Sequence, residues 1–325
     1  MEYGDKHILV LGAGASGIGA SWVLAQVGAH VVLNDYKPVT LPADEEKRLV
    51  SAGVDIITGR QDESLLDGVD RIVISPGISL DIPIVKAAQA RGIDVVSEVE
   101  VAYELSKSPI VAVTGTNGKT TTTTLLTKVL EGTGKPVRVG GNIGDSLSEV
   151  AYSMPADGFL VAELSSYQLE TIKHFRPIGA IMLNITPDHL ARHKTMENYI
   201  AAKERIFENQ LSTDFMVLNI DDPIVADMKH RAPSHILEIS QHQVVSNGAY
   251  YDKGQCYVTK NGIATPVIGS ADIHIPGSHN IENILTVIAL AYALSVPIET
   301  IHRIISEFHG VEHRLERVKT LDRSE

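Results

Sequence analysis

The sequence contains a single cysteine, Cys256, in 325 residues. One thiol cannot form an internal disulfide, and such low cysteine content is typical of proteins in a reducing compartment. The chain also lacks an apolar run near the roughly 20 residues that a membrane-spanning helix needs. Its first residues show no signal-peptide pattern. We therefore expect a cytoplasmic protein with no membrane association.

Positive charge is scarce as well, with 28 Lys and Arg against 40 Asp and Glu and a net charge of −12. This balance argues against nucleic acid as a partner and fits an enzyme that acts on small molecules. The chain is 44% apolar and 21% charged, which is ordinary for a globular protein with a good core. Its length suits two domains or three small ones.

Residues 111–124 read VAVTGTNGKTTTTT, the most informative stretch of the chain. An apolar strand, a glycine loop and the start of a helix follow one another, as in loops that bind phosphate through backbone N–H groups. Lys119 is expected to reach the β- and γ-phosphates of ATP or GTP, and the Thr120 hydroxyl to hold Mg²⁺. The loop departs from the common pattern because Val113 stands where the first glycine is expected. The alternative is a glycine turn with an incidental lysine.

A second glycine motif, GAGASG at 12–17, follows an apolar strand at 7–11. The next strand, 30–35, ends in Asp35, so the motif has the context of a dinucleotide-binding fold. It predicts a nucleotide or diphosphate site without specifying the nucleotide. Strands near 54–59, 70–77 and 93–97 and a helix near 81–91 continue the alternation.

Another α/β unit begins near Pro109, with buried strands at 136–141, 159–164 and 178–185. A helix at 196–210 and a strand at 215–220 follow. Residues 235–275 contain Asn-Gly at 247–248 and 261–262 and predict a small, mostly antiparallel sheet. Helices return over 278–308, with Pro297 opening the second. We predict an α/β protein with a Rossmann-like parallel-sheet domain at 1–97, a P-loop NTPase-like domain at 98–311, and the start of another domain at 312–325.

Polar clusters follow several strands of the second unit, where ligands of open α/β sheets bind. Gly140–Gly144 indicates either close backbone approach to a ligand or a flexible turn. Glu163 is a candidate Mg²⁺ ligand or a salt-bridged strand end. His189 and His193 have a spacing that could hold zinc, but a third ligand is not evident and phosphate chemistry favours Mg²⁺. We interpret His193 as a surface histidine and Lys203 as an ordinary solvated helix lysine.

Weaker signals lie near the end of the chain, at Asn280, Asn283, His313 and Arg314. Asparagine could contact an adenine edge, and arginine could neutralise a phosphoryl group in transfer.

Together these stretches resemble the Mur ligase family over essentially the whole chain. GTNGKTTTT, GGNIG, ELSSYQLE, NITPDHL, AAKERIFEN, HNIEN and EHR occur in order, and GAGASG with SPGIS at 75–79 favours the member that adds D-glutamate to UDP-N-acetylmuramoyl-L-alanine. The resemblance implies ATP and Mg²⁺ as cofactors and a role in peptidoglycan precursor synthesis. A carboxylate would be phosphorylated by ATP, and the amine of D-glutamate would then attack the acyl phosphate.

The resemblance also implies residue roles. The implied catalytic residues are Lys119, Lys203, His189, Glu163 and His313. The implied ATP-binding residues are Gly115, Thr116, Asn117, Gly118, Lys119, Thr120, Thr121, Asn280, Asn283 and Arg314. The implied substrate-binding residues are Ala15, Ser16, Asp35, Ser75, Pro76, Gly77, Asn142 and Ser165. The implied metal ligands are Thr120, Glu163, His189 and a carbamylated Lys203.

Family members are about a third longer and carry a further domain that binds the amino acid. We therefore expect this polypeptide to bind the UDP-linked substrate, to bind Mg-ATP weakly and to make little product. We also expect it to be a monomer. Three alternatives stay open: an NAD-dependent oxidoreductase, a non-catalytic nucleotide-binding module, and a relative of folylpolyglutamate synthase.

Overall fold

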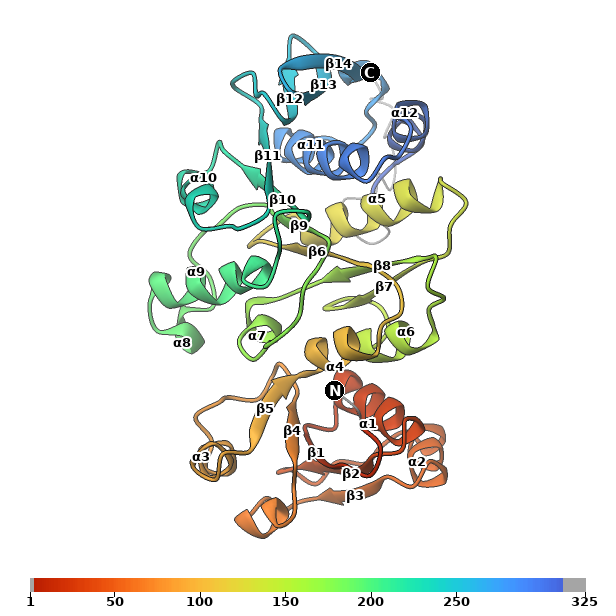
Figure 1. Ribbon diagram of the computed structural model, residues 1–325, viewed down its shortest axis with the longest axis vertical. Helices are drawn as coiled ribbons and strands as arrows, with labels where there is room; N and C mark the ends of the chain where they lie inside the picture. Colours follow the sequence, from red (N-terminus) through yellow and green to blue (C-terminus); the bar gives the residue numbers. More distant parts are fainter. Residues whose placement is uncertain (1–2, 312–325) are drawn as a thin grey trace, which may run out of the picture.

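Two sheets, one above the other along the long axis of the molecule, contain the strands of this computed structural model, which describes residues 3–311 (Figure 1). The smaller sheet is parallel, in the order β3-β2-β1-β4-β5. Its strands are β1 (His7–Leu11), β2 (His30–Asp35), β3 (Asp55–Thr58), β4 (Arg71–Ile74) and β5 (Asp94–Ser97), and its helices are α1 (Ala15–Gln26), α2 (Ala43–Ser51) and α3 (Pro83–Ala90). The strand order reverses beside β1, so the loops after β1 and β4 border the crevice where ligands of such sheets bind.

The larger sheet has nine strands in the order β14-β13-β12-β11-β10-β9-β6-β8-β7. Its strands are β6 (Ile110–Thr114), β7 (Val137–Gly141), β8 (Phe159–Glu163), β9 (Gly179–Met182), β10 (Phe215–Asn219), β11 (His235–Ser240), β12 (Gly248–Asp252), β13 (Gln255–Lys260) and β14 (Ile263–Gly269). Its helices are α5 (Lys119–Glu131), α6 (Leu147–Ser153), α7 (Ser166–Leu169), α8 (Leu190–His193), α9 (Met196–Glu204), α10 (Pro223–Asp227), α11 (Ser278–Ala293) and α12 (Ile298–Ser306). The α/β class expected from the sequence is confirmed.

The antiparallel part of this sheet differs in detail from the expectation. β12, β13 and β14 pair antiparallel, as predicted, but β12 also pairs parallel to β11, so these strands extend the large sheet. Asn261 and Gly262 form the β13–β14 hairpin turn with φ of 52° and 77°. The other Asn-Gly pair is not a hairpin turn, because Gly248 begins β12, and the β12–β13 turn uses Lys253 and Gly254 instead.

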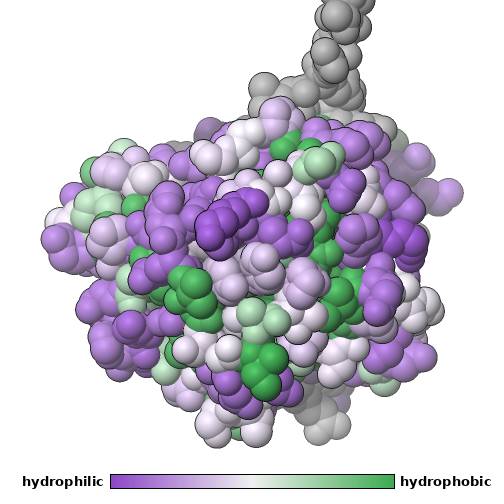
Figure 2. All heavy atoms as spheres, turned by 90° about the horizontal axis from the view of Figure 1, so that it is seen from above, coloured by the Kyte–Doolittle hydropathy of each residue, from purple (hydrophilic) through white to green (hydrophobic). Residues whose placement is uncertain are grey.

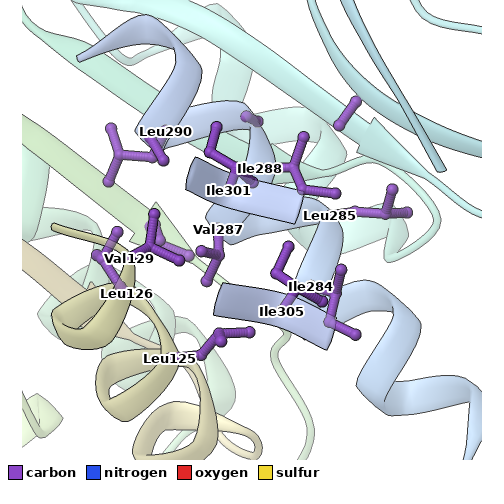
Figure 3. Close-up of a cluster of buried hydrophobic side chains, with 14 of the residues drawn as sticks. Leu125, Leu126, Val129, Ile284, Leu285, Val287, Ile288, Leu290, Ile301 and Ile305 are labelled. Atoms are coloured by element: carbon purple, nitrogen blue, oxygen red, sulfur yellow. The ribbon is translucent and has the colours of Figure 1, made fainter. Parts of the chain in front are cut away.

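Helix α5 is held in place by apolar contacts with α11 and α12 (Figure 3). Leu125, Leu126 and Val129 of α5 face Ile284, Val287 and Ile288 of α11, and Ile301 and Ile305 of α12 close the cluster. All eight side chains are at most 1% exposed. This packing fixes the N-terminus of α5, where the predicted phosphate loop ends, beside the first turns of α11.

Helix α4 (Glu98–Leu105) lies between the two sheets (Figure 1). Val99 and Ala102 pack in a core of the large sheet, whereas Val101 and Leu105 pack against the small one. Because α4 serves both cores, its contacts do not assign it to one unit, and the domain limits at residues 97 and 98 stay a prediction.

Apolar side chains on the surface occur in small groups separated by polar ones, as the view from the β12–β14 end shows (Figure 2). Val244 and Ile263, both more than two-thirds exposed, belong to this part of the chain. Within residues 3–311, no helix has the length and apolar character needed to cross a bilayer.

Candidate functional site

The loop between β6 and α5 has the backbone of a phosphate-binding turn. Gly115 and Gly118 have φ of 150° and 85°, which L-residues rarely adopt. A Cβ on Gly118 would lie 2.5 Å from Asn283 Oδ1, and one on Gly115 would lie 2.8 Å from Leu183 Cβ. Lys119 Nζ donates to the carbonyl oxygens of Gly115 and Thr116 at 3.1 and 2.8 Å, so its ammonium group lies over the loop.

The segment after β9 supports this loop from one side. Asn184 Oδ1 accepts a hydrogen bond from the Asn117 N–H at 2.8 Å, and Asn184 Nδ2 donates to the Asn117 carbonyl at 3.1 Å. The Thr116 hydroxyl donates to the Thr186 carbonyl at 3.2 Å. The sequence-based prediction assigns Asn184 no role, although an amide directly after a buried strand indicates a candidate ligand or loop contact.

Lys203, on α9, lies directly beneath the phosphate loop. Its Nζ donates to the Gly115 carbonyl at 2.8 Å and to Thr114 Oγ1 at 3.3 Å. The side chain is 2% exposed, so the interpretation as a solvated lysine is wrong. Burial, together with the nearby charge of Lys119, lowers the pKa of Lys203 to about 7.

Tyr199, one turn earlier on α9, was also missed by the sequence analysis. Its hydroxyl lies 3.0 Å from Thr116 Oγ1, and its ring centroid lies 5.1 Å from Lys203 Nζ. The buried Tyr199 side chain thus contacts both the lysine and the loop.

Glu163 ends β8 next to the same loop, because Val113 of β6 pairs with it across the sheet. The residue is 1% exposed. Its Oε1 accepts a hydrogen bond from Asn142 Nδ2 at 2.9 Å, while Oε2 has no hydrogen-bond partner among the described residues. A buried carboxylate oxygen without a donor is costly, and a bound cation would relieve that cost. Asn142, predicted to contact substrate, holds the other oxygen in place.

His189 lies beside the rings of Tyr167 and Tyr199. It has a left-handed backbone, with φ of 54°, and its half-exposed ring lies 5.0 Å from the Tyr167 ring. Within residues 3–311, no three or more His, Cys, Asp and Glu side chains are grouped as a metal site. The candidate ligand set contains only Glu163 and His189 of these types; Thr120 and Lys203 complete it.

His193 is not a surface residue as expected. It is 6% exposed, its Nε2 lies 2.9 Å from Ser166 Oγ, and its Nδ1 lies 3.4 Å from Glu170 Oε1. Burial lowers the pKa of His193. Ser165, another predicted substrate contact, is the N-cap of α7 and accepts a hydrogen bond from the Gln168 N–H.

The first glycine loop shows a different role for each glycine. Gly12 has φ of 99°, and a Cβ on Gly17 would lie 1.8 Å from the Gly12 carbonyl oxygen, so α1 packs directly on the loop. Gly14 has open space around it, which leaves the backbone accessible to a ligand. Asp35 Oδ2 accepts a hydrogen bond from the Ala13 N–H at 3.0 Å, and Ser75 Oγ donates to the Gly12 carbonyl.

The other residues predicted to contact the UDP-linked substrate also come directly after strands of the small sheet. Ala15 and Ser16 open α1, and Pro76 and Gly77 lie in the turn after β4. All of them border the crevice side of the small sheet.

The predicted adenine contacts lie on the first turns of α11. Asn283 Nδ2 donates to Asn280 Oδ1 at 3.1 Å, and both residues are buried behind Gly118. Thr121 follows Thr120 in the first turn of α5. His313 and Arg314 lie outside the described residues.

A cavity of about 710 Å³ lies where the two units face each other. Ser79 and Asp81 line it from the small-sheet unit, and Arg192, Lys194 and Asn198 line it from α8 and its surroundings. The Arg192 guanidinium lies over the Tyr167 ring and pairs with Glu170 at 2.6 Å, so the cavity adjoins the residues around His189.

Known protein families match both units. The model described as Mur ligase middle domain matches residues 113–291, and that described as Mur ligase MurD-like, N-terminal domain matches residues 6–97. UDP-N-acetylmuramoylalanine–D-glutamate ligase of Thermoanaerobacter sp. (strain X514) is 44% identical over 322 residues, which are 99% of this chain and 71% of that protein. The protein of the same name from Halalkalibacterium halodurans is 42% identical over 98% of this chain and 70% of its own length.

Solved structures share the fold at lower identity. The UDP-N-acetylmuramate:L-alanyl-γ-D-glutamyl-meso-diaminopimelate ligase from Neisseria meningitides has a TM-score of 0.66 at 21% identity, covering 95% of this chain and 100% of that one. The UDP-N-acetylmuramate-alanine ligase from Thermotoga maritima has a TM-score of 0.55 at 24% identity, covering 94% of this chain and 69% of that one. With a phosphate loop, a nucleotide-type glycine loop and relatives of this kind over nearly its whole length, the chain belongs to the Mur ligase family.

Proposed function

We propose that this chain belongs to an ATP-dependent ligase that joins D-glutamate to UDP-N-acetylmuramoyl-L-alanine, a step of peptidoglycan precursor synthesis. The observation that carries the proposal is the pair of glycine loops on one molecule, one after β1 and one after β6. The names of relatives 40–44% identical over at least 98% of the chain supply the substrates.

The first loop suits the uridine diphosphate part of the substrate. A pyrophosphate can approach the open backbone at Gly14, and the N-terminus of α1 favours its negative charge. Ser16, Asp35 and the turn at 75–77 surround that position from neighbouring strand ends. The substrate would then extend along the crevice toward the large sheet.

The second loop suits the triphosphate of ATP. The N-terminus of α5, which begins at Lys119, would face the phosphates with its positive end, and Lys119 would turn from the Gly115 and Thr116 carbonyl oxygens to the γ-phosphate. Asn280 and Asn283 would lie beside the base, because Asn283 touches Gly118 from α11.

Mg²⁺ fits the residues present. Glu163 Oε2, which is buried and has no hydrogen-bond partner among the described residues, is a ready oxygen ligand. Thr120 lies in the first turn of α5, and His189 lies in the segment after β9. When bound, Mg²⁺ would offset the repulsion between the substrate carboxylate and the γ-phosphate.

Lys203 would assist as a carbamate. A neutral amine is needed for reaction with CO₂, and its pKa of about 7 makes the neutral form available near physiological pH. The ammonium group would lose one proton to give the neutral amine, whose nitrogen would bond to the carbon of CO₂ and release a second proton. A buried cation would thus become a carboxylate-like anion.

The reaction itself is carboxylate activation. Transfer of the γ-phosphoryl group to the L-alanine carboxylate breaks the β–γ bond of ATP and forms an acyl phosphate. The amine of D-glutamate then attacks the carbonyl carbon, phosphate leaves, and the nitrogen loses a proton. This chain's residues bind and orient the two anions, with Lys119 placed to stabilise the transferring phosphoryl group.

The test compares Lys119→Ala with Lys128→Ala, an exposed lysine of the same helix, by calorimetric titration with ATP and Mg²⁺. We expect Lys119→Ala to weaken ATP binding at least about a hundredfold, in line with loss of a charged hydrogen-bonded contact. Lys128→Ala should bind like the unmodified chain. Equal ATP affinity in both variants would contradict the phosphate-loop assignment.

A further inference from the structure

Glu98 is a buried carboxylate that the proposed reaction does not use. It is the first residue of α4 and is 2% exposed. Its Oε1 accepts hydrogen bonds from Ser146 Oγ at 2.5 Å, from Ser148 Oγ at 3.0 Å and from the Ser148 N–H at 2.8 Å. These donors belong to the start of α6, in the large-sheet unit.

The same carboxyl group also reaches the first glycine loop. Ser16 lies close enough to Glu98 to act with Ser146 and Ser148 against burial, which nevertheless raises the pKa of Glu98. Oε2 has no partner at ordinary hydrogen-bond distance among the described residues. Glu98 therefore lies between a predicted UDP-binding residue and the first turn of α6.

The two units touch closely around this carboxylate. A Cβ on Gly19 of α1 would lie 2.1 Å from Ser146 Oγ, so the helix needs glycine there to approach α6. Arg48 Nη1 and Glu149 Oε1 form an ion pair at 2.6 Å across the same contact. Because α1 packs directly on Ser146, a displacement of the glycine loop and α1 also displaces the start of α6.

From α6 the contacts continue to the metal candidate. Ser146 follows the loop 141–145, in which the Gly141 N–H donates to the Asp145 carbonyl at 3.4 Å. The next residue, Asn142, donates its backbone N–H to the Glu163 carbonyl at 2.8 Å and its side-chain amide to Glu163 Oε1. The contacts from α1 through Ser146 and Glu98 thus lead to the carboxylate beside the phosphate loop.

We propose that Glu98 is a positioning residue that couples the two ligand sites, so that a uridine diphosphate group at the first glycine loop and a nucleoside triphosphate at the second favour each other's binding. A ligand that orders the first glycine loop and α1 holds Ser146 against Glu98, because Gly19 of α1 packs on Ser146. This contact in turn fixes the start of α6 and the orientation of Asn142 and Glu163. The effect is reciprocal, because linkage requires each ligand to change the affinity of the other by the same factor. The inference rests on the proposed function.

The experiment measures the dissociation constant of UDP by calorimetry, without and with a saturating non-hydrolysable ATP analogue and Mg²⁺. In the unmodified chain we expect UDP to bind about fivefold to tenfold more tightly with the analogue present, the lower range of measured couplings. Glu98→Gln should bring this ratio close to one while both ligands still bind.

Glu100→Gln is the matched control. Glu100 is also fully buried on α4, but its carboxylate accepts the backbone N–H groups of Lys173, His174 and Phe175, far from both loops in the sequence. This variant should lose thermal stability and keep the ratio. A merely structural role for Glu98 would make the two variants behave alike.

Ser148→Ala keeps the proposal testable if Glu98→Gln does not fold, because it removes one hydroxyl donor and leaves the backbone N–H in place. It should lower the ratio without abolishing it. An unchanged ratio in Glu98→Gln or Ser148→Ala, or an equal loss in Glu100→Gln, overturns the coupling role. If the unmodified chain does not bind UDP at all, the proposed function fails; if it binds UDP with a ratio of one, only the coupling fails.

Discussion

Glu163 and Lys203 are ionisable side chains buried beside the phosphate loop, and burying such groups without a ligand costs free energy. Glu163 Oε2 lacks a donor among the described residues, and burial lowers the pKa of Lys203 to about 7. Buried ionisable groups often lie at functional sites, where a ligand compensates the cost of their burial. The proposed cation at Glu163 and carbamate at Lys203 would account for their burial.

Glu163→Gln tests this cost directly. A neutral amide is less costly to bury than a carboxylate, so the free energy of unfolding without Mg²⁺ should rise by about 1 kcal/mol. Mg²⁺ should raise the melting temperature of the unmodified chain and leave that of the variant unchanged. The exposed Glu131→Gln is the control and should respond to Mg²⁺ as the unmodified chain does. Equal stabilisation of Glu163→Gln by Mg²⁺ would remove Glu163 from the ligand set.

Lys203 predicts a pH-dependent reaction with CO₂. At constant dissolved CO₂, the carbamate signal in ¹³C NMR should grow as pH rises from 6 to 8, because the neutral fraction of Lys203 increases through its pKa of about 7. Lys203→Arg should lack this signal, whereas Lys128→Arg should retain it. A signal that survives in Lys203→Arg would place the carbamate elsewhere.

The lowered pKa of Lys203 also determines whether the stability of the folded chain rises or falls with pH. The folded pKa of Lys203 lies below the value of 10.5 for an ordinary lysine, so the unfolded chain binds more protons between about pH 7 and pH 10.5. In buffer free of CO₂, Lys203 should therefore contribute stability that increases with pH across this window.

At the scale of elements, the phosphate loop depends on the helix that packs behind it. Gly118 is the N-cap of α5 and touches Asn283 of α11, and the apolar contacts of α5 with α11 and α12 hold both in place (Figure 3). The position needs glycine for two reasons, its φ of 85° and its lack of space.

Gly118→Ala separates these reasons when it is compared with Gly134→Ala. Gly134 has φ of 80°, but nothing lies within 4 Å of its Cβ position. Both variants should lose about 1 kcal/mol from backbone strain, and Gly118→Ala should lose a further 1–2 kcal/mol and most of its ATP affinity. Urea denaturation and ATP titration measure the two effects. Equal stability and equal ATP affinity in the two variants would show that Asn283 does not constrain the loop.

The elements nearest the motifs were the easiest to predict from the sequence. GAGASG and GTNGKT each specify a strand, a turn and a helix start through local backbone requirements, and both are confirmed as such. The joining of β12 to β11 was not predicted, because strand pairing depends on contacts between residues distant in sequence.

Burial likewise could not be read from local pattern. Nothing near Lys203 or His193 marks them as buried, since their surroundings come from the loops after β6 and β8. Only the family resemblance pointed to Lys203. Tyr199 and Asn184 were missed because their hydrogen bonds to the phosphate loop bridge residues more than 60 positions apart.

At the scale of the whole molecule, the two units, each with one nucleotide-type glycine loop, meet in a closely packed contact. Helix α4 belongs to both cores, and the α1–α6 contact leaves no room for a side chain at Gly19. The chain spans 71% of the length of its Thermoanaerobacter relative. The expectation that the 325-residue polypeptide makes little product stays a prediction.

The most direct measurement is a calorimetric titration of the 325-residue chain with UDP-N-acetylmuramoyl-L-alanine and, separately, with NAD⁺, since GAGASG and Asp35 alone are compatible with either ligand. We predict saturable binding of the UDP-linked substrate with one site per chain, and no binding of NAD⁺ at the same concentrations. Saturable binding of NAD⁺ without binding of the UDP-linked substrate would contradict the ligase assignment.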